Sequence, residues 1–294
     1  MNTQPDPPIE NPVRPFYWSV RRELWENRSV YIAPLVVAAV VLFATAINTT
    51  RLPRRIRTAE PAKRHAVIVT PFSLAPAPIM MATLLVGFFY CLDALYGERR
   101  DRSILFWKSL PVSDRTTVLS KASIPMVVLP LIALGLSVVT QFLLLQLGSL
   151  ILMGNGMSPG TLWGEFGFFQ GLPIMVYGLT IHALWFAPIY GWLLLVSAWA
   201  RRAPVLWALF PPLAIAAVEK IVFNTTLFMN MLGYRMTGAM REGFVLRGKH
   251  VDVERFSQLD PARFLSAPGL WVGLIFAALC LAAAVRLRRN REPI

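Results

Sequence analysis

Residues 123–152 read SIPMVVLPLIALGLSVVTQFLLLQLGSLIL, a run of 30 residues without one charged side chain. A helix needs about 20 consecutive apolar residues to cross the hydrocarbon core of a bilayer. The run is therefore long enough to span a membrane, with length left over for a tilt or a kink. Pro125 and Pro130 lie near its start, where a proline removes a helix hydrogen bond.

Five further apolar runs lie on either side of this one. Hydrophobic residues make up 55% of the 294 residues and charged residues only 15%, against about 25% charged residues in an average soluble domain. The sequence therefore predicts an all-α membrane protein with six transmembrane helices, at residues 31–47, 74–95, 123–152, 172–199, 204–223 and 268–285. The predicted domains are a tail with an interfacial helix, a transmembrane domain and a basic tail, over residues 1–30, 31–285 and 286–294.

The formal net charge of +13 has a membrane explanation. The basic residues lie at the ends of the apolar runs, which is typical of membrane flanks and not of a nucleic-acid surface. Cys91 and Cys280 both lie inside apolar runs, so they form neither a disulfide framework nor a Cys-x-x-Cys metal site. No small-residue cleavage site closely follows the first apolar run, which predicts a retained helix and not a signal peptide.

The segment before the first span has the pattern of an amphipathic helix. Between residues 14 and 29, Phe16, Val20, Leu24 and Trp25 recur at helical spacing, with charged residues between them. Such a helix lies in the plane of the membrane interface and contacts lipid. An ordinary basic flank of the first span is the alternative interpretation.

Lysine and arginine residues indicate the orientation, because cytoplasmic loops of membrane proteins carry more of them. With a cytoplasmic N-terminus, the inside segments hold 16 of these residues and the outside segments hold 12. The basic loop at residues 51–64 would then lie outside, which argues against this topology. Composition alone therefore leaves the opposite orientation open.

A charged segment with an apolar centre separates the second and third spans. Residues 93–121 read DALYGERRDRSILFWKSLPVSDRTTVLSK. Ser103 can cap a short helix and Pro111 ends it, while Ser113 or Asp114 can cap the helix that follows. A loop that only turns the chain needs no such apolar centre.

This short helix has the composition of a docking element for a soluble protein. Trp107 would be the aromatic anchor, surrounded by a rim of charges of both signs. Loss of that anchor should weaken docking by about 2 kcal/mol. A basic loop that only follows the membrane surface is the alternative interpretation.

At these residues the sequence resembles the ABC-2 type transporter permeases, whose bacterial members of about this length carry a run like GERRDRSILFWKSLPVSD after the second span. The resemblance implies an ABC-2 (type V exporter-like) permease fold with a cytoplasmic coupling segment at residues 96–121. It places both termini in the cytoplasm and residues 224–267 in an outer loop. The coupling residues that it implies are Glu98, Arg99, Arg100, Asp101, Arg102, Ser103, Ile104, Leu105, Phe106, Trp107, Lys108 and Leu110.

The function implied by the resemblance is that of the permease subunit of an ABC transporter in the bacterial inner membrane, most naturally an exporter. ATP and Mg²⁺ would bind to a separate ATPase chain. Two permeases, this chain twice or this chain with a close relative, would assemble with two ATPases and contact membrane lipid. The alternatives are an ABC-type sensor or assembly subunit that moves no solute and, after it, a membrane-embedded enzyme.

Polar residues inside the spans are candidates for the translocation path, because burying them in lipid is costly. Gln141 and Gln146 in the third span either line a path or hold helices together, and the sequence does not choose between these roles. His182 in the fourth span is a further candidate, although a hydrogen bond to a neighbouring helix is a simpler role for it.

The stretch GFVLRGKH at residues 243–250 comes within one residue of the phosphate-binding loop G-x-x-x-x-G-K-[ST]. His250 stands where a Ser or Thr hydroxyl would bind Mg²⁺, and no buried strand leads into the stretch. The three histidines are far apart in the sequence, and neither HExxH nor GxSxG occurs. We therefore expect no nucleotide, catalytic or metal site on this chain.

Overall fold

The computed structural model describes residues 13–109, 112–244 and 258–290. Leu110 and Pro111 of the predicted docking helix lie outside the described residues, as do Gly248, Lys249 and His250.

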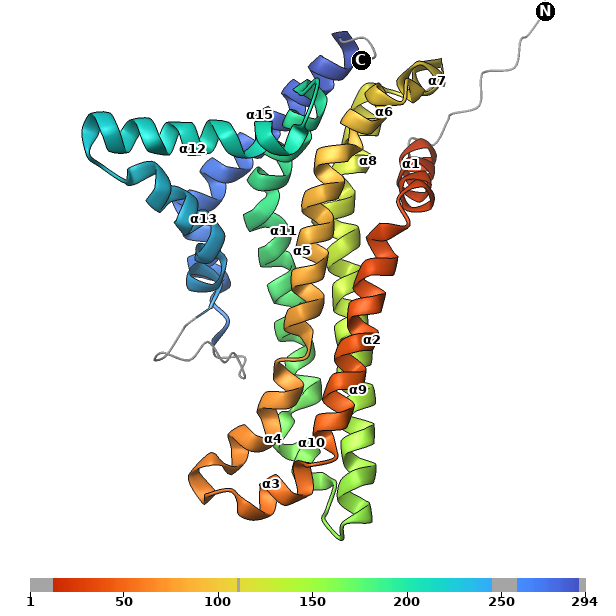
Figure 1. The fold of residues 1–294 in the computed structure, drawn as a ribbon, viewed down its shortest axis with the longest axis vertical. Helices are drawn as coiled ribbons and strands as arrows, with labels where there is room; N and C mark the ends of the chain where they lie inside the picture. Colours follow the sequence, from red (N-terminus) through yellow and green to blue (C-terminus); the bar gives the residue numbers. More distant parts are fainter. Residues whose placement is uncertain (1–12, 110–111, 245–257, 291–294) are drawn as a thin grey trace, which may run out of the picture.

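Long helices run side by side along the main axis of the molecule, and shorter helices lie at both ends (Figure 1). The first half of the chain forms α1 (Val13–Glu26), α2 (Ser29–Thr49), α3 (Leu52–Thr58), α4 (Arg64–Ser73), α5 (Pro76–Ala94), α6 (Tyr96–Arg100), α7 (Ser103–Ser109) and α8 (Asp114–Ser123). The second half forms α9 (Leu129–Gly154), α10 (Gly160–Phe166), α11 (Phe168–Trp199), α12 (Pro204–Phe223), α13 (Leu227–Gly243), α14 (Pro261–Ser266) and α15 (Pro268–Asn290).

Six helical segments in the described part of the chain are long and apolar enough to cross a membrane: Ser29–Thr49, Pro61–Arg100, Asp114–Gly154, Gly160–Trp199, Pro204–Phe223 and Pro268–Asn290. The predicted all-α, multi-pass architecture is therefore confirmed. The second, third and fourth segments have 40 or 41 residues, more than predicted, because short helices lead almost without interruption into the long ones. In the third segment, the turn from Ile124 to Val128 is a π-helix at Pro125, where the sequence predicted a kink.

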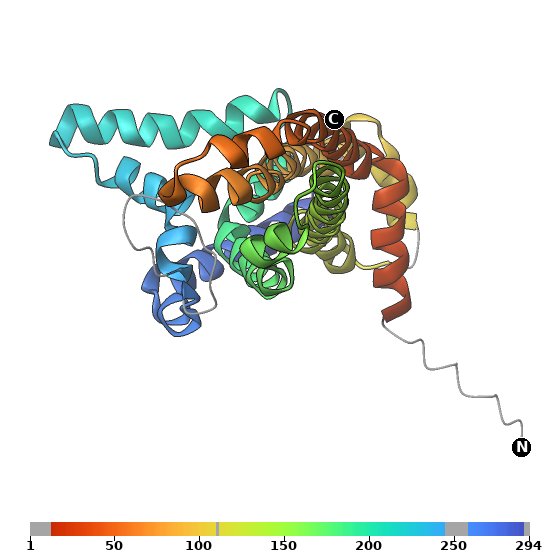
Figure 2. The same cartoon turned by 90° about the horizontal axis from the view of Figure 1, so that it is seen from below.

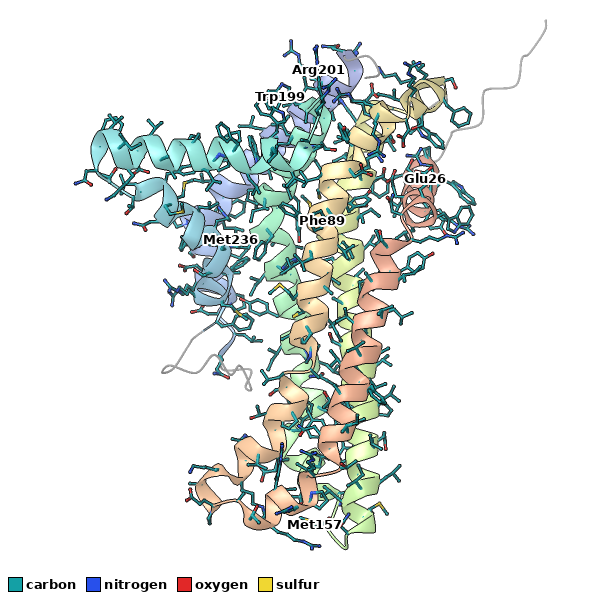
Figure 3. The ribbon with its side chains drawn as sticks, in the orientation of Figure 1. Glu26, Phe89, Met157, Trp199, Arg201 and Met236 are labelled. Carbon is teal, nitrogen blue, oxygen red and sulfur yellow. The ribbon has the colours of Figure 1, made fainter. Side chains whose placement is uncertain are left out.

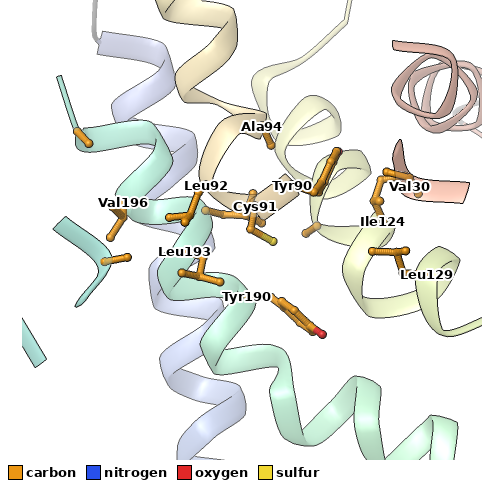
Figure 4. Close-up of a cluster of buried hydrophobic side chains, with 14 residues drawn as sticks. Val30, Tyr90, Cys91, Leu92, Ala94, Ile124, Leu129, Tyr190, Leu193 and Val196 are labelled. Atoms are coloured by element: carbon orange, nitrogen blue, oxygen red, sulfur yellow. The ribbon is translucent and has the colours of Figure 1, made fainter. Parts of the chain in front are cut away.

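The bundle is held together by a core in which α5, α9 and α11 meet. Figure 4 shows this core near the ends of α5 and α11, with Cys91 of α5 beside Leu193 of α11 and Tyr90 of α5 toward Val30 and Ile124. Helices α11 and α15 approach closely at Gly191, where a Cβ atom would lie 3.1 Å from the Cα atom of Ala277. Small residues at such crossings let helix backbones pack directly against each other in a membrane.

The short helices define two ends of the molecule. One end carries α1, α6, α7 and the C-terminal turns of α15, and we call it the α7 end; the other carries α3, α4 and α10 (Figure 1). Figure 3 shows the same division, with Trp199 and Arg201 at the α7 end and Met157 at the opposite end. The predicted docking segment, the interfacial helix and the basic tail thus begin from the same end of the bundle.

Helix α12 differs from the arrangement predicted for the fifth span. It lies across the long axis of the bundle and not along it (Figures 1 and 2). Its single buried residue is Ala208, whose carbonyl accepts a hydrogen bond from the indole of Trp192 at 3.1 Å. Most other apolar side chains of α12 are exposed, up to 81% for Ile221, because the helix packs on its own chain mainly near its start.

The segment at residues 224–267, predicted as an outer loop, contains α13 and α14. The guanidinium of Arg235 in α13 donates hydrogen bonds to the carbonyl oxygens of Trp185 at 3.2 Å and Gly269 at 2.6 Å. The indole of Trp185 in turn donates to the carbonyl of Arg235 at 2.8 Å. These bonds attach α13 to α11 and to the start of α15, so this described part of the segment is helical and packs on the bundle.

Candidate docking site at the α7 end

The predicted docking helix forms α7. The residues on either side of it define where α7 begins and where α8 begins. Between α6 and α7, Arg102 adopts a left-handed conformation with φ of 58°, which is uncommon for a residue with a side chain and turns the chain sharply. The hydroxyl of Ser103 lies 3.4 Å from the carbonyl oxygen of Glu98, to which it donates. Helix α8 is capped by Ser113, whose hydroxyl accepts from the amide of Thr116 at 3.1 Å, so Ser113 and not Asp114 is the cap.

Helix α7 has one face in the protein and one face free. Ile104 is 2% exposed and holds the helix to the bundle, whereas Leu105 and Phe106 are 59% and 60% exposed. The ammonium of Lys108 donates to the carbonyl of Arg289 at 3.4 Å, near the end of α15. Two adjacent large apolar side chains therefore point away from the protein on a helix that is fixed from behind.

Trp107 has a different surrounding from the one predicted. Its side chain is half-buried, and the guanidinium carbon of Arg22 in α1 lies 3.9 Å from the centre of its ring. The ring also meets the edge of Phe106, at 4.9 Å between ring centres. Cation–π contacts of this kind contribute about 0.5 to 2 kcal/mol. Trp107 thus joins α7 to α1 and supports Phe106, which is the more exposed of the two rings.

Behind α7 lies a group of four buried charged side chains, Glu23, Glu98, Lys121 and Arg288, which we call the buried charge cluster. The ammonium of Lys121 lies 2.8 Å from a carboxylate oxygen of Glu23 and 3.1 Å from one of Glu98. The guanidinium of Arg288 lies 2.9 Å from the other carboxylate oxygen of Glu98. None of the four side chains is more than 7% exposed.

Two charges at the rim complete this network. Arg22 contacts Glu23 at 2.8 Å and Glu98 at 3.5 Å, and Asp114 contacts Arg288 at 2.6 Å. The six side chains carry three positive and three negative charges, so the network is neutral. Because they come from α1, α6, α8 and α15, the network ties together helices that are far apart in the sequence.

The electrostatics of Glu23 show how strongly the network favours its charged form. Burial alone would raise the pKa of this carboxyl. The positive charge of Lys121 and hydrogen bonds from Lys121 and Arg22 outweigh burial and lower the pKa below its ordinary value of 4.5. The hydroxyl of Tyr90 in α5 donates a further hydrogen bond to Glu23, at 2.9 Å. Glu23 is therefore an ionised residue inside the protein.

A second set of bonds joins this end to α11. The guanidinium of Arg99 donates to the carbonyl oxygens of Ala198 at 2.6 Å and Ala200 at 3.2 Å, where α11 ends. The hydroxyl of Ser197 accepts from the amides of Leu95 at 3.0 Å and Tyr96 at 2.9 Å. These bonds satisfy backbone groups at two helix ends, which otherwise have no partner within their helices.

Comparisons of this chain with protein-family models, curated proteins and solved structures gave no match. The site is therefore described from the geometry and charges of the described residues alone. Buried ion pairs join α1, α6, α8 and α15, and the exposed apolar pair Leu105 and Phe106 lies on α7, directly after α6.

The charged residues predicted as the approach to the docking helix divide into two groups. Glu98 and Arg99 are 7% and 4% exposed, and their side chains contact other residues of this chain, so a docked protein would not reach them. Arg100, Asp101 and Arg102 are exposed, and Arg100 pairs with Asp101 at 2.9 Å. The exposed three remain the charged rim of the site.

The three candidates for a translocation path do not converge. Gln141 is buried, and its amide donates to the carbonyl of Phe72 at 3.1 Å, which fastens α9 to α4. Gln146 is exposed on the outside of α9. His182 is half-buried, and its Nε2 atom lies 3.1 Å from the hydroxyl of Tyr190, which belongs to the same helix α11 and not to a neighbouring helix as predicted. Gln141 therefore joins two helices in this structure, which accords with one of the two roles left open by the sequence.

Sequence reasoning missed most of the buried charge cluster. Lys121 entered the prediction only as the last residue of the coupling segment at 96–121, Arg288 only as part of the basic tail, and Glu23 only as one of the charges of the amphipathic helix. The sequence did contain an indication that Glu23 is buried. Glu23 lies on the same helical face as Val20, which packs against the core, and Asn27, which is half-buried. A lone carboxylate on the inward face of a helix requires a buried cation as partner.

Proposed function

We propose that this chain is the membrane-spanning permease subunit of a two-component ABC transporter of the ABC-2 type, and that α7 docks a separate ATPase. The observation that supports this most is the exposed pair Leu105 and Phe106 on a helix anchored by Ile104 and Trp107. An apolar centre with an aromatic side chain, surrounded by a polar rim, is the usual composition of a protein–protein interface.

The buried charge cluster supplies the route by which docking would move the transmembrane helices. Glu98 lies in α6, directly before α7, and pairs with Lys121 of α8 and Arg288 of α15. A displacement of α7 pulls on Glu98 and is passed to these helices, because separating buried ion pairs costs several kcal/mol. ATP and Mg²⁺ bind to the ATPase, and this chain converts the motion of that partner into movement of its own bundle.

In this proposal the α7 end lies in the cytoplasm of a bacterial cell, with both termini on that side of the inner membrane. Two permeases pair with two ATPases, because ATP binds between two nucleotide-binding chains. Export is the direction that accords with the resemblance to the ABC-2 permeases.

Site-specific photo-cross-linking in living cells tests the proposal. Replacement of Phe106 by p-benzoylphenylalanine should give an adduct with a soluble ATPase, identified by mass spectrometry. The matched control is Met153, which is equally exposed at 60% but lies near the C-terminal end of α9, at the end of the bundle opposite α7. The absence of an ATPase adduct at position 106, or the same adducts at both positions, would contradict the proposal.

A further inference from the structure

The outer face of α1 combines aromatic rings with an arginine. Tyr17, Trp18 and Trp25 are 57%, 55% and 63% exposed, and Arg21 is exposed between the two tryptophans. The guanidinium carbon of Arg21 lies 5.1 Å from the ring centre of Trp18 and 4.6 Å from that of Trp25. Trp18, Arg21 and Trp25 form one continuous group on the helix, which we call the Trp-Arg-Trp face.

The charge of Arg21 is not balanced by the acids of its own helix. Both carboxylates nearby, Glu23 and Glu26, pair with Arg22, at 2.8 Å and 3.7 Å. In the described part of the chain, Arg21 has no ion pair, and its contacts are to the two indole rings. The face is therefore both apolar and positively charged.

The opposite face of α1 fixes this group in place. Ser19 and Glu23 are buried, and Glu23 is held by Lys121 and Arg22 in the buried charge cluster. Figure 2 shows α1 lying across the bundle, directly before α2 turns along it. The Trp-Arg-Trp face therefore lies directly before the first candidate span, Ser29–Thr49.

We propose that the Trp-Arg-Trp face binds the headgroup phosphate of an anionic phospholipid. The guanidinium of Arg21 offers planar hydrogen-bond donors that match a phosphate. The rings of Trp18 and Trp25 occupy the interface beside it, where amphipathic rings are favoured. An anionic headgroup is preferred over a zwitterionic one, because Arg21 has no ion pair in the described part of the chain and its charge would repel the cation of the latter. The inference does not depend on the proposed transport function.

Lipid binding to the purified full-length protein in detergent tests this inference. Native mass spectrometry would compare retention of phosphatidylglycerol, phosphatidylcholine and inorganic phosphate by the wild type. Arg21→Gln should weaken phosphatidylglycerol binding about fivefold, which corresponds to about 1 kcal/mol for one basic residue near an anionic surface. Arg115→Gln is the matched control, because Arg115 is an exposed arginine of α8 for which the structure gives no aromatic contact.

Three outcomes would overturn the inference. The first is an equal effect of Arg21→Gln and Arg115→Gln on phosphatidylglycerol binding. The second is equal retention of phosphatidylglycerol and phosphatidylcholine by the wild type. The third is inorganic phosphate that displaces the lipid at the same concentration, which would make the face a general anion site.

Discussion

Lys121→Met should destabilise the protein more than the loss of any single surface charge, because Lys121 is buried between two carboxylates. Lys121 serves two carboxylates at once, Glu23 at 2.8 Å and Glu98 at 3.1 Å, and its side chain is 3% exposed. Breaking a buried ion pair by removing one partner costs about 3 to 5 kcal/mol. Each carboxylate keeps another cation, Arg22 or Arg288, so we expect the lower value, about 3 kcal/mol.

The assay follows thermal unfolding in detergent with a thiol-reactive fluorophore, since Cys91 is buried and reacts only when the bundle opens. A loss of about 3 kcal/mol should lower the apparent Tm by about 6 °C or more. Lys63→Met is the matched control, because Lys63 pairs with Glu60 at 2.8 Å on the surface, where such pairs contribute at most about 1 kcal/mol. Equal shifts for Lys63→Met and Lys121→Met would refute the reasoning.

Three further predictions test individual contacts. Because the pKa of Glu23 is lowered from 4.5, its stabilising contribution should be complete above about pH 4.5 and decline below it; the apparent Tm of Glu23→Gln should depend less on pH in that acid range. Gln141→Leu should lower stability by about 1 kcal/mol through loss of the bond to Phe72 and leave transport unchanged, which a transport assay in proteoliposomes checks. Trp107→Ala should speed cleavage of α1 by trypsin as well as weaken docking, because Trp107 contacts Arg22; unchanged cleavage would show that this contact does not hold α1.

The membrane architecture followed from the sequence because lipid imposes a simple length and polarity requirement. Residues 123–152 and the other apolar runs meet that requirement whatever they pack against. Helix α7 was predictable for a similar local reason, since the apolar residues 104–107 are bounded by polar and proline residues within a few positions.

The buried charge cluster was not predictable in the same way, because its pairs are distant in the sequence. Glu23 and Lys121 are separated by 98 positions, and Glu98 and Arg288 by 190. A local pattern shows each of these charges only as part of a polar flank, and so Glu98 was placed on the docking surface. The direction of α12 could not be predicted for the same reason. The local sequence of an apolar helix does not indicate the axis along which the helix packs.

Stimulation of ATP hydrolysis tests the central claim, that α7 couples a separate ATPase to this bundle, most directly. The chain and the ATPase identified by cross-linking would be reconstituted in nanodiscs, and hydrolysis measured for the wild type, Phe106→Ala and Phe169→Ala. Phe169 is the matched control, because it is 72% exposed at the other end of the bundle. We expect Phe106→Ala to weaken ATPase binding by about 2 kcal/mol, roughly thirtyfold, and to reduce the stimulated rate at limiting ATPase, while Phe169→Ala behaves as the wild type. Normal binding and normal stimulation in Phe106→Ala would contradict the claim.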